Sequence, residues 1–106
     1  VHDLAKPRVV LANIYRALRP EGVFLMMDMA ASSLLEENLD HPIGPTLYAV
    51  SVMHCMTVSL AQGGEGLGTM WGEQTAQEYL KEAGFSDIQS HHLEGDPMHV
   101  FYVARA

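Results

Sequence analysis

The chain has 106 residues and a formal net charge of −7, from 13 acidic and 6 basic side chains. Hydrophobic residues make up 48% of it and charged residues 18%, which predicts a single globular domain rather than a disordered chain. The acidic balance argues against nucleic acid and against an anionic membrane surface as partners, because both require clustered Lys and Arg.

The single cysteine, Cys55, excludes an internal disulfide, and no stretch has the pattern of a signal peptide. The most apolar stretch, 47–61, is interrupted by polar residues and is too short to cross a bilayer. A reducing cytoplasm is therefore the expected location. The sequence begins at Val1 without Met, which suggests a piece of a longer protein.

Apolar residues at helical spacing predict a first helix, which begins near Pro7, is capped by Asp3 and ends at the Pro-Glu-Gly turn 20–22. The run 23–27 is continuously apolar and stops at Asp28. This pattern predicts a strand that is buried on both faces, as in a parallel sheet.

Residues 29–72 show a mixed pattern. A short helix capped by Ser32 or Ser33 is expected first, followed by a loop and then by a helix over 46–61. The β-branched residues in 46–61 also leave a strand open as an alternative. If the segment is helical, its polar stripe runs through Ser51, His54 and Thr57.

The segment 62–69, QGGEGLGT, has the G-x-G-x-G spacing of a nucleotide-binding loop. It follows a predicted helix rather than a strand, and Thr69 stands where the dinucleotide fingerprint needs its last glycine. These two features argue against a nucleotide-binding oxidoreductase. We expect instead a flexible connection, part of a lid anchored by Trp71.

An amphipathic helix is predicted over 73–83, with Gly84 as its C-terminal stop. Two strands follow, over 85–93 and 98–104, close enough in sequence to form an antiparallel hairpin. The alternation of helices and strands indicates an α/β sheet.

Two segments resemble class I S-adenosylmethionine-dependent methyltransferases. Residues 2–28, HDLAKPRVVLANIYRALRPEGVFLMMD, resemble the family's helix that ends in L-x-P-G-G and leads into its fifth strand, with Glu21 replacing the first Gly. Residues 78–106, EYLKEAGFSDIQSHHLEGDPMHVFYVARA, resemble its C-terminal end, where a helix ending in AGF precedes two strands, the last one antiparallel. The segment 47–72 resembles the substrate-side insert of a bacterial subgroup that carries an N-terminal winged-helix-like region.

The resemblance implies an α/β fold: the C-terminal half of a Rossmann-like methyltransferase sheet, with a helical insert over 29–72 and a terminal antiparallel strand pair. It implies that the cofactor loop and the ribose-binding acid lie upstream of Val1, so that 1–106 lacks the N-terminal half. The intact protein is then expected to be a transferase that uses S-adenosyl-L-methionine to methylate a small-molecule substrate, mainly at oxygen. The segment alone is expected to be inactive.

The pair His2 and Asp3 is the chemical centre that the resemblance implies. Plant-type small-molecule O-methyltransferases carry His-Asp at this place, and His2 is similar to their general base. On that basis His2 is expected as base and cofactor contact, and Asp3 as its neighbour or a cofactor-side contact. The alternatives are that Asp3 caps the helix and that His2 only lines a pocket.

Asp28 ends the first predicted strand, and ligands of open α/β sheets lie beyond the carboxyl ends of strands. It is therefore a candidate substrate contact, with a solvated strand-end acid as the alternative. Further candidate substrate contacts lie in the insert: Tyr48, Ser51, His54 and Trp71. For His54 the alternative is a hydrogen-bonded core residue.

Other conspicuous residues are not assigned to the site. Cys55 has no basic partner nearby in sequence, which favours an unreactive thiol. Met53 and Met56 are expected in core packing. His91 and His92 are adjacent and point to opposite faces of a strand, so no metal site is predicted there.

A non-catalytic role is the alternative to the enzyme. A half-sheet leaves an open strand edge, which is a template for pairing with another chain. The chain would then be a fragment that self-associates, as a homodimer or by a domain swap, or docks to a partner through that edge.

Overall fold

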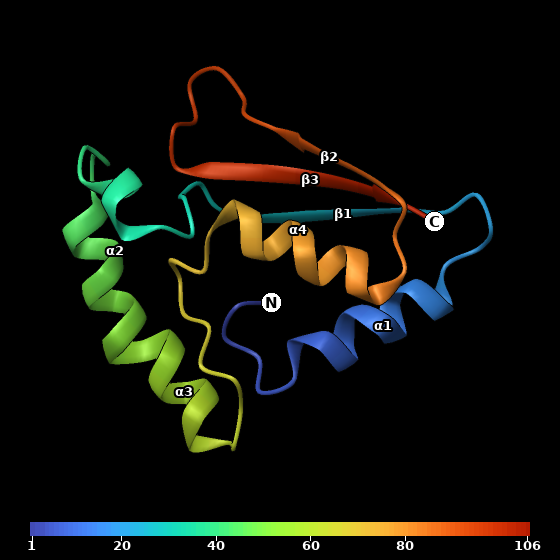
Figure 1. The fold of residues 1–106 in the computed structure, drawn as a ribbon, viewed down its shortest axis with the longest axis horizontal. Coiled ribbons are helices and arrows are strands. Elements are labelled where there is room, and N and C mark those ends of the chain that lie inside the picture. Colours follow the sequence, from blue (N-terminus) through green and yellow to red (C-terminus); the bar gives the residue numbers. More distant parts are fainter.

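The computed structural model describes all 106 residues. It contains one small sheet, with helices along one side of it and beyond one end of its strands (Figure 1). None of its helices combines the length and the apolar character needed to traverse a bilayer. In chain order the elements are α1 (Pro7–Ala17), β1 (Val23–Met29), the 3₁₀ helix η1 (Leu35–Asn38), α2 (Gly44–Val50), the π-helical turn η2 (Ser51–Cys55), α3 (Met56–Ala61), α4 (Gly72–Ala83), β2 (Asp87–His91) and β3 (His99–Arg105).

The three strands form a sheet in the order β1-β3-β2, and β3 runs antiparallel to both neighbours. The predicted C-terminal hairpin is therefore confirmed, and β3 inserts between the other two strands. Met26 of β1 lies opposite Tyr102 of β3, and Ile88 of β2 lies opposite Ala104. The chain is a mixed helix and strand domain, as the sequence predicts.

Helices α1 and α4 lie along the same side of the sheet (Figure 1). The core forms between them and the strands, around Leu11 of α1, Leu80 of α4 and Tyr102 of β3, all fully or almost fully buried. The ring of Phe85 connects these layers, since it meets the ring of Tyr15 edge-on at a centroid distance of 5.2 Å.

The opposite face of the sheet is open. Side chains alternate along β1, so Met26 and Asp28 are buried whereas Leu25 and Met27 are exposed. The expectation that this strand is buried on both faces is wrong. A continuously apolar run is compatible with burial on two faces, but α1 and α4 both pack on the same one.

The start of α1 differs from expectation in its cap. Pro7 lies in the first turn of the helix as predicted. The N-cap residue is Lys6, and no side chain caps the helix by a hydrogen bond. Asp3 does not cap this helix; its half-exposed carboxylate lies 3.9 Å from the amino group of Val1. At the other predicted stop, Gly84 ends α4 with φ 121°, as expected of a glycine.

The helix expected over 46–61 is present as the continuous run of α2, η2 and α3, so the strand alternative is wrong. Its buried face differs from the apolar one expected, because Ser51 of the predicted polar stripe is buried while His54 and Thr57 are exposed. Ser51, Cys55 and Ser59 are buried, whereas Met53, expected in the core, is 80% exposed. The reason is that the glycine-rich segment 62–69 packs on this face of the helix. Its backbone can come close only to small side chains such as serine.

The segment 62–69 is packed against the helical run and the N-terminal residues. Gly64 N–H donates to the carbonyl of Ser59 at 2.8 Å, and Glu65 N–H donates to the carbonyl of Ala5 at 3.1 Å. Two further amides of the segment donate to serine hydroxyls of the helical run. Because these amides are already bonded within the protein, they are not free to bind phosphate, and the segment is a tight connection rather than the flexible lid expected.

Candidate functional site

Four polar side chains converge where the N-terminal residues cross the end of β1 and the π-helical turn. His2 is the centre of this group, which also contains Asp28, Cys55 and Thr69. Its Nδ1 lies 2.9 Å from Oδ1 and 3.1 Å from Oδ2 of Asp28, and its Nε2 lies 3.3 Å from Sγ of Cys55. We call these four residues the His2 cluster.

Asp28 reaches the cluster because of the alternation along β1. It shares a face with Met26, so its side chain points into the protein and is only 3% exposed. A buried carboxylate needs partners, and Asp28 has two: the His2 ring and the backbone N–H of Met29, which donates to Oδ1 at 2.8 Å. The alternative of a solvated strand-end acid is therefore wrong.

The contact with Asp28 sets the tautomer of His2. An ionised carboxylate only accepts hydrogen bonds, so Nδ1 carries the proton and donates to it. In the neutral ring Nε2 is then the acceptor, and it faces the thiol of Cys55. The ring thus has an oriented lone pair on a side chain that is 18% exposed.

The surroundings shift the pKa values of both His2 and Cys55. Burial alone would lower the pKa of His2, but the hydrogen bonds and charges of Asp28 and, to a smaller extent, Cys55 together outweigh it and raise that pKa above its usual range. Burial would likewise raise the pKa of Cys55, yet hydrogen bonds with Thr69, His54 and His2 lower it below its usual range. Both shifts favour movement of a proton from the sulfur to the imidazole.

Cys55 occupies the last position of the π-helical turn η2, a local geometry that recurs at functional sites. Its Sγ lies 2.9 Å from Oγ1 of Thr69 and 3.8 Å from Nδ1 of His54. The sequence offered no basic partner for this thiol, whereas the fold supplies His2 from 53 positions away. The absence of a basic partner nearby in sequence therefore does not mean that the folded thiol lacks one.

Of the residues proposed from the sequence, His2 and Asp28 are brought into direct contact. Ser51 lies next to the cluster, because its Oγ accepts the backbone N–H of Thr69 at 3.0 Å. His54 is exposed and touches the cluster only through the sulfur of Cys55.

Three proposed residues lie apart from the cluster's contacts. Asp3 faces the amino group of Val1 rather than the His2 ring. The hydroxyl of Tyr48 accepts a hydrogen bond from Nδ2 of Asn38 at 3.0 Å. Trp71 is buried in the core, where it meets the ring of Tyr79 edge-on at 5.7 Å, so it anchors the glycine-rich segment to α4.

Sequence reasoning missed Cys55 and Thr69. A usable signal was present, because small polar residues recur every four positions along the helical run, at Ser51, Cys55 and Ser59. That spacing marks one helix face, and a face of small polar side chains next to a glycine-rich segment indicates close approach of the two.

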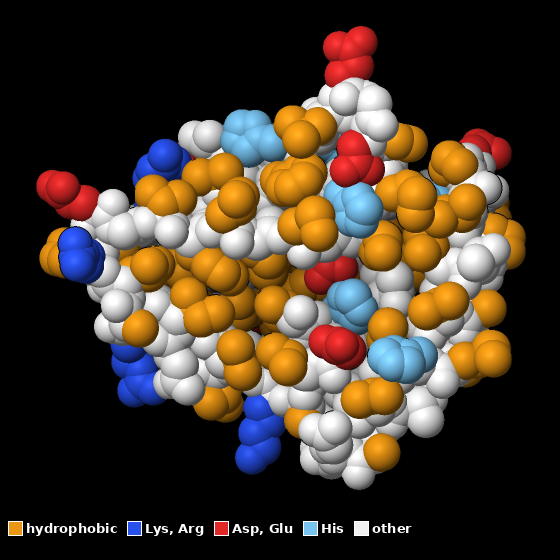
Figure 2. Space-filling view, turned by 180° about the vertical axis from the view of Figure 1, so that it is seen from behind, with side chains coloured by type: hydrophobic (Ala, Val, Ile, Leu, Met, Phe, Trp, Pro, Cys, Tyr) orange, Lys and Arg blue, Asp and Glu red, His pale blue; other side chains and the backbone are white.

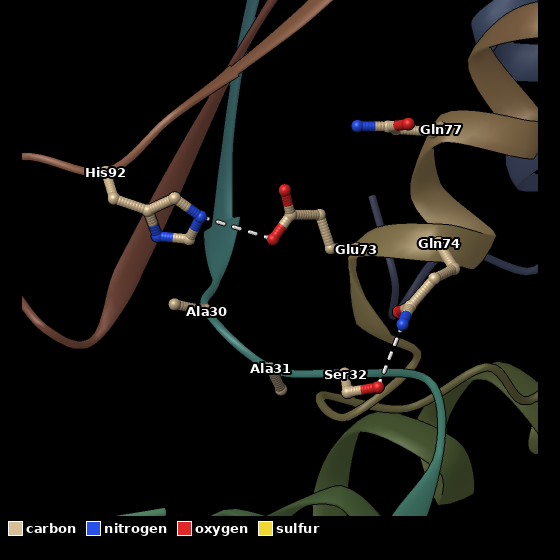
Figure 3. Close-up of a pocket in the computed structure, with 7 residues that line it drawn as sticks. All are labelled: Ala30, Ala31, Ser32, Glu73, Gln74, Gln77 and His92. Atoms are coloured by element: carbon tan, nitrogen blue, oxygen red, sulfur yellow. Dashed lines mark hydrogen bonds and ion pairs between the residues drawn. The ribbon is translucent and has the colours of Figure 1, made fainter. Parts of the chain in front are cut away.

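A separate hollow of about 450 Å³ lies between residues 30–32, the start of α4 and His92 (Figure 3). Most of its polar side chains are already paired with one another: Nε2 of His92 lies 3.2 Å from Oε2 of Glu73, and Nε2 of Gln74 donates to Oγ of Ser32 at 2.9 Å. It shares no residue with the His2 cluster. The cluster is therefore the better candidate for chemistry.

Comparison with protein-family models found no match, and a search of curated proteins found none either.

Proposed function

We propose that this chain is the C-terminal part of an S-adenosylmethionine-dependent methyltransferase, which methylates a hydroxyl of a small molecule with His2 as general base. The observation that supports it most is the His2–Asp28 contact at 2.9 Å. Methyl transfer from a sulfonium needs an aligned nucleophile, and a hydroxyl nucleophile must also lose its proton.

His2 has the features required of that base. Asp28 holds the proton on Nδ1, so Nε2 is the nitrogen that would accept the proton of a substrate hydroxyl, which would have to replace the Cys55 thiol as its partner. The buried carboxylate also stabilises the imidazolium that forms, as the acid does in a catalytic triad. In this proposal Asp28 takes the orienting role for which the sequence suggested Asp3.

Two features of the topology support the proposal. The last strand, β3, is antiparallel to its neighbours, and α4 ends at the Gly84–Phe85 pair. The helical run from Gly44 to Ala61 lies beside the His2 cluster, where a substrate-side insert belongs. The cofactor loop would be supplied by residues upstream of Val1.

A methylation assay tests the proposal. The longer reading frame that contains this chain would be incubated with S-adenosylmethionine labelled in its methyl group and with a panel of small phenols. We expect labelled methyl ethers, and a fall in kcat of about a hundredfold or more for His2→Gln and Asp28→Asn. The control His92→Gln should keep full activity, because His92 contacts Glu73 and not the His2 cluster.

Two results would contradict the proposal. One is the absence, in the upstream sequence, of an acid followed by G-x-G-x-G. The other is tight binding of S-adenosylmethionine by residues 1–106 alone in calorimetry, since the cofactor loop is placed outside them.

The open face and free edge of the sheet favour a second candidate, a non-catalytic module that self-associates. β1 is an edge strand, and Val23, Leu25 and Met27 are exposed beside that edge. Hydrophobic side chains are also spread widely over the side of the molecule opposite to the view of Figure 1 (Figure 2). Sedimentation velocity over a series of concentrations tests this candidate, and a monomer at every concentration would exclude it.

A further inference from the structure

We propose that Cys55 is a nucleophilic thiol, activated by the His2–Asp28 pair, and that it is a site of covalent modification by small, soft carbon electrophiles. The inference depends only on contacts within the His2 cluster. It does not require that the protein transfer methyl groups.

The geometry is that of a nucleophile, a base and an orienting acid. Sγ of Cys55 lies 3.3 Å from Nε2 of His2, and Nδ1 of the same ring lies 2.9 Å from Oδ1 of Asp28. The three side chains come from the π-helical turn, the N-terminal residues and β1, so the tertiary fold alone assembles them. The same order of groups activates the nucleophile of cysteine hydrolases.

The cluster also stabilises the sulfur as a thiolate. Oγ1 of Thr69 lies 2.9 Å from Sγ and can donate its proton to a negatively charged sulfur. The titratable groups that face the sulfur are His2 and His54, and Asp28 lies behind the His2 ring. No carboxylate contacts the sulfur itself, so its surroundings favour negative charge. The lowered pKa of Cys55 and the raised pKa of His2 have the directions that this arrangement requires.

The reaction balances without any oxidant or further reagent. The thiol proton passes from the sulfur of Cys55 to Nε2 of His2, and the imidazolium remains against Asp28. With iodoacetamide, the thiolate attacks the methylene carbon, a sulfur–carbon bond forms, the carbon–iodine bond breaks and iodide leaves. The electrophile must be small, because Cys55 is 6% exposed and the His2 ring beside it only 18%.

Alkylation with iodoacetamide tests the inference directly. Since Cys55 is the only cysteine, the intact mass reports modification of one site. The rate would be measured from about pH 5 to 10, for the folded protein and for the protein unfolded in urea. We expect the midpoint of the rate profile to lie at lower pH in the folded protein than in the unfolded one.

Variants identify the source of the activation. His2→Gln should slow alkylation at neutral pH about tenfold, since it removes a hydrogen bond to a charged group, and should move the midpoint to higher pH. Thr69→Val should move the midpoint in the same direction while keeping His2. The matched control His92→Gln removes a histidine outside the cluster and should leave the profile unchanged.

Three outcomes would overturn the inference: no alkylation of the folded protein, a midpoint at or above that of the unfolded chain, or the same midpoint in His2→Gln and wild type. The first two need no variant, so a folding defect cannot obscure them. If Cys55 shows the expected enhanced reactivity but no methyl transfer is found, only the proposed function is refuted. If methyl transfer is found but the thiol is inert, only this inference is refuted.

Discussion

His2 and Asp28 are 26 positions apart in the sequence, and their side chains meet at 2.9 Å within the protein. This contact fastens the residues that precede α1 to the end of β1. It also fixes the roles of the two ring nitrogens of His2: Nδ1 carries the proton and donates it to Asp28, and Nε2 is the acceptor. The predictions about charge therefore begin with this pair.

Replacing Asp28 by Asn should lower the pKa of His2 relative to wild type. Burial acts to lower that pKa, and the hydrogen bond and charge of Asp28 are the largest of the contributions that raise it, ahead of those of Cys55. Removal of the negative charge takes away the larger part of what opposes burial. NMR titration of the imidazole protons measures the change, with His92 as an internal reference. An unchanged His2 titration would show that Asp28 does not control it.

The stability of the protein should depend on pH through His2. Its pKa is raised on folding, so the stabilising contribution is complete below the pKa of the unfolded histidine and is lost as pH rises through the folded value. The difference in free energy of unfolding between wild type and His2→Gln should therefore be larger at acidic than at alkaline pH. Urea unfolding on both sides of neutrality measures it, and a difference that does not narrow with rising pH would contradict the assignment.

Met26 and Met27 form a matched test of the open sheet face. They are neighbours in β1, but Met26 is 4% exposed and Met27 is 55% exposed. Met26→Ala should lower the free energy of unfolding by about 2–5 kcal/mol, because it leaves a cavity. Met27→Ala should change it by about 0.5 kcal/mol or less, since it removes few contacts. Similar losses for both variants in urea unfolding would mean that the second face is covered as well.

The close approach of the glycine-rich segment can be tested at Gly64. A Cβ there would lie 2.4 Å from Cα of Ala5, a backbone atom that cannot rotate away. Gly64→Ala should therefore destabilise the protein by about 1–3 kcal/mol through overpacking. The control is Gly95→Ala, where no atom lies within 4 Å and only the positive φ of 85° opposes the side chain, at about 1–2 kcal/mol. If urea unfolding shows Gly64→Ala to be as stable as wild type, the segment is not packed as described.

Local patterns in the sequence predict the helices and the hairpin well. The apolar spacing in α1 and α4, the stop at Gly84 and the turn between β2 and β3 depend on neighbouring residues, and all are found in the structure. The sidedness of β1 and of the helical run is different. It depends on which distant segment covers each face. An apolar run such as 23–27 does not indicate which of its two faces will be covered.

The candidate site shows the same division. The position of Asp28 at a strand end and the chemistry of His2 are visible in the sequence, which is why both were proposed. Their pairing with Cys55 is not visible, because contacts across 26 and 53 positions arise only after the N-terminal residues fold back over β1 and η2. The sequence instead favoured Asp3 as the partner of His2, but the carboxylate of Asp3 faces the amino group of Val1.

The place of β3 in the sheet has a consequence for how the protein is made. β1 and β2 each pair with β3 and with no other strand, although β3 is the last of the three to be synthesised. Until it leaves the ribosome, the apolar run of β1 lacks the strand that pairs with it in this sheet. Formation of the sheet must then wait for the end of translation of this region, and the chain depends on late, long-range pairing, which is slow and exposes unpaired strands to aggregation.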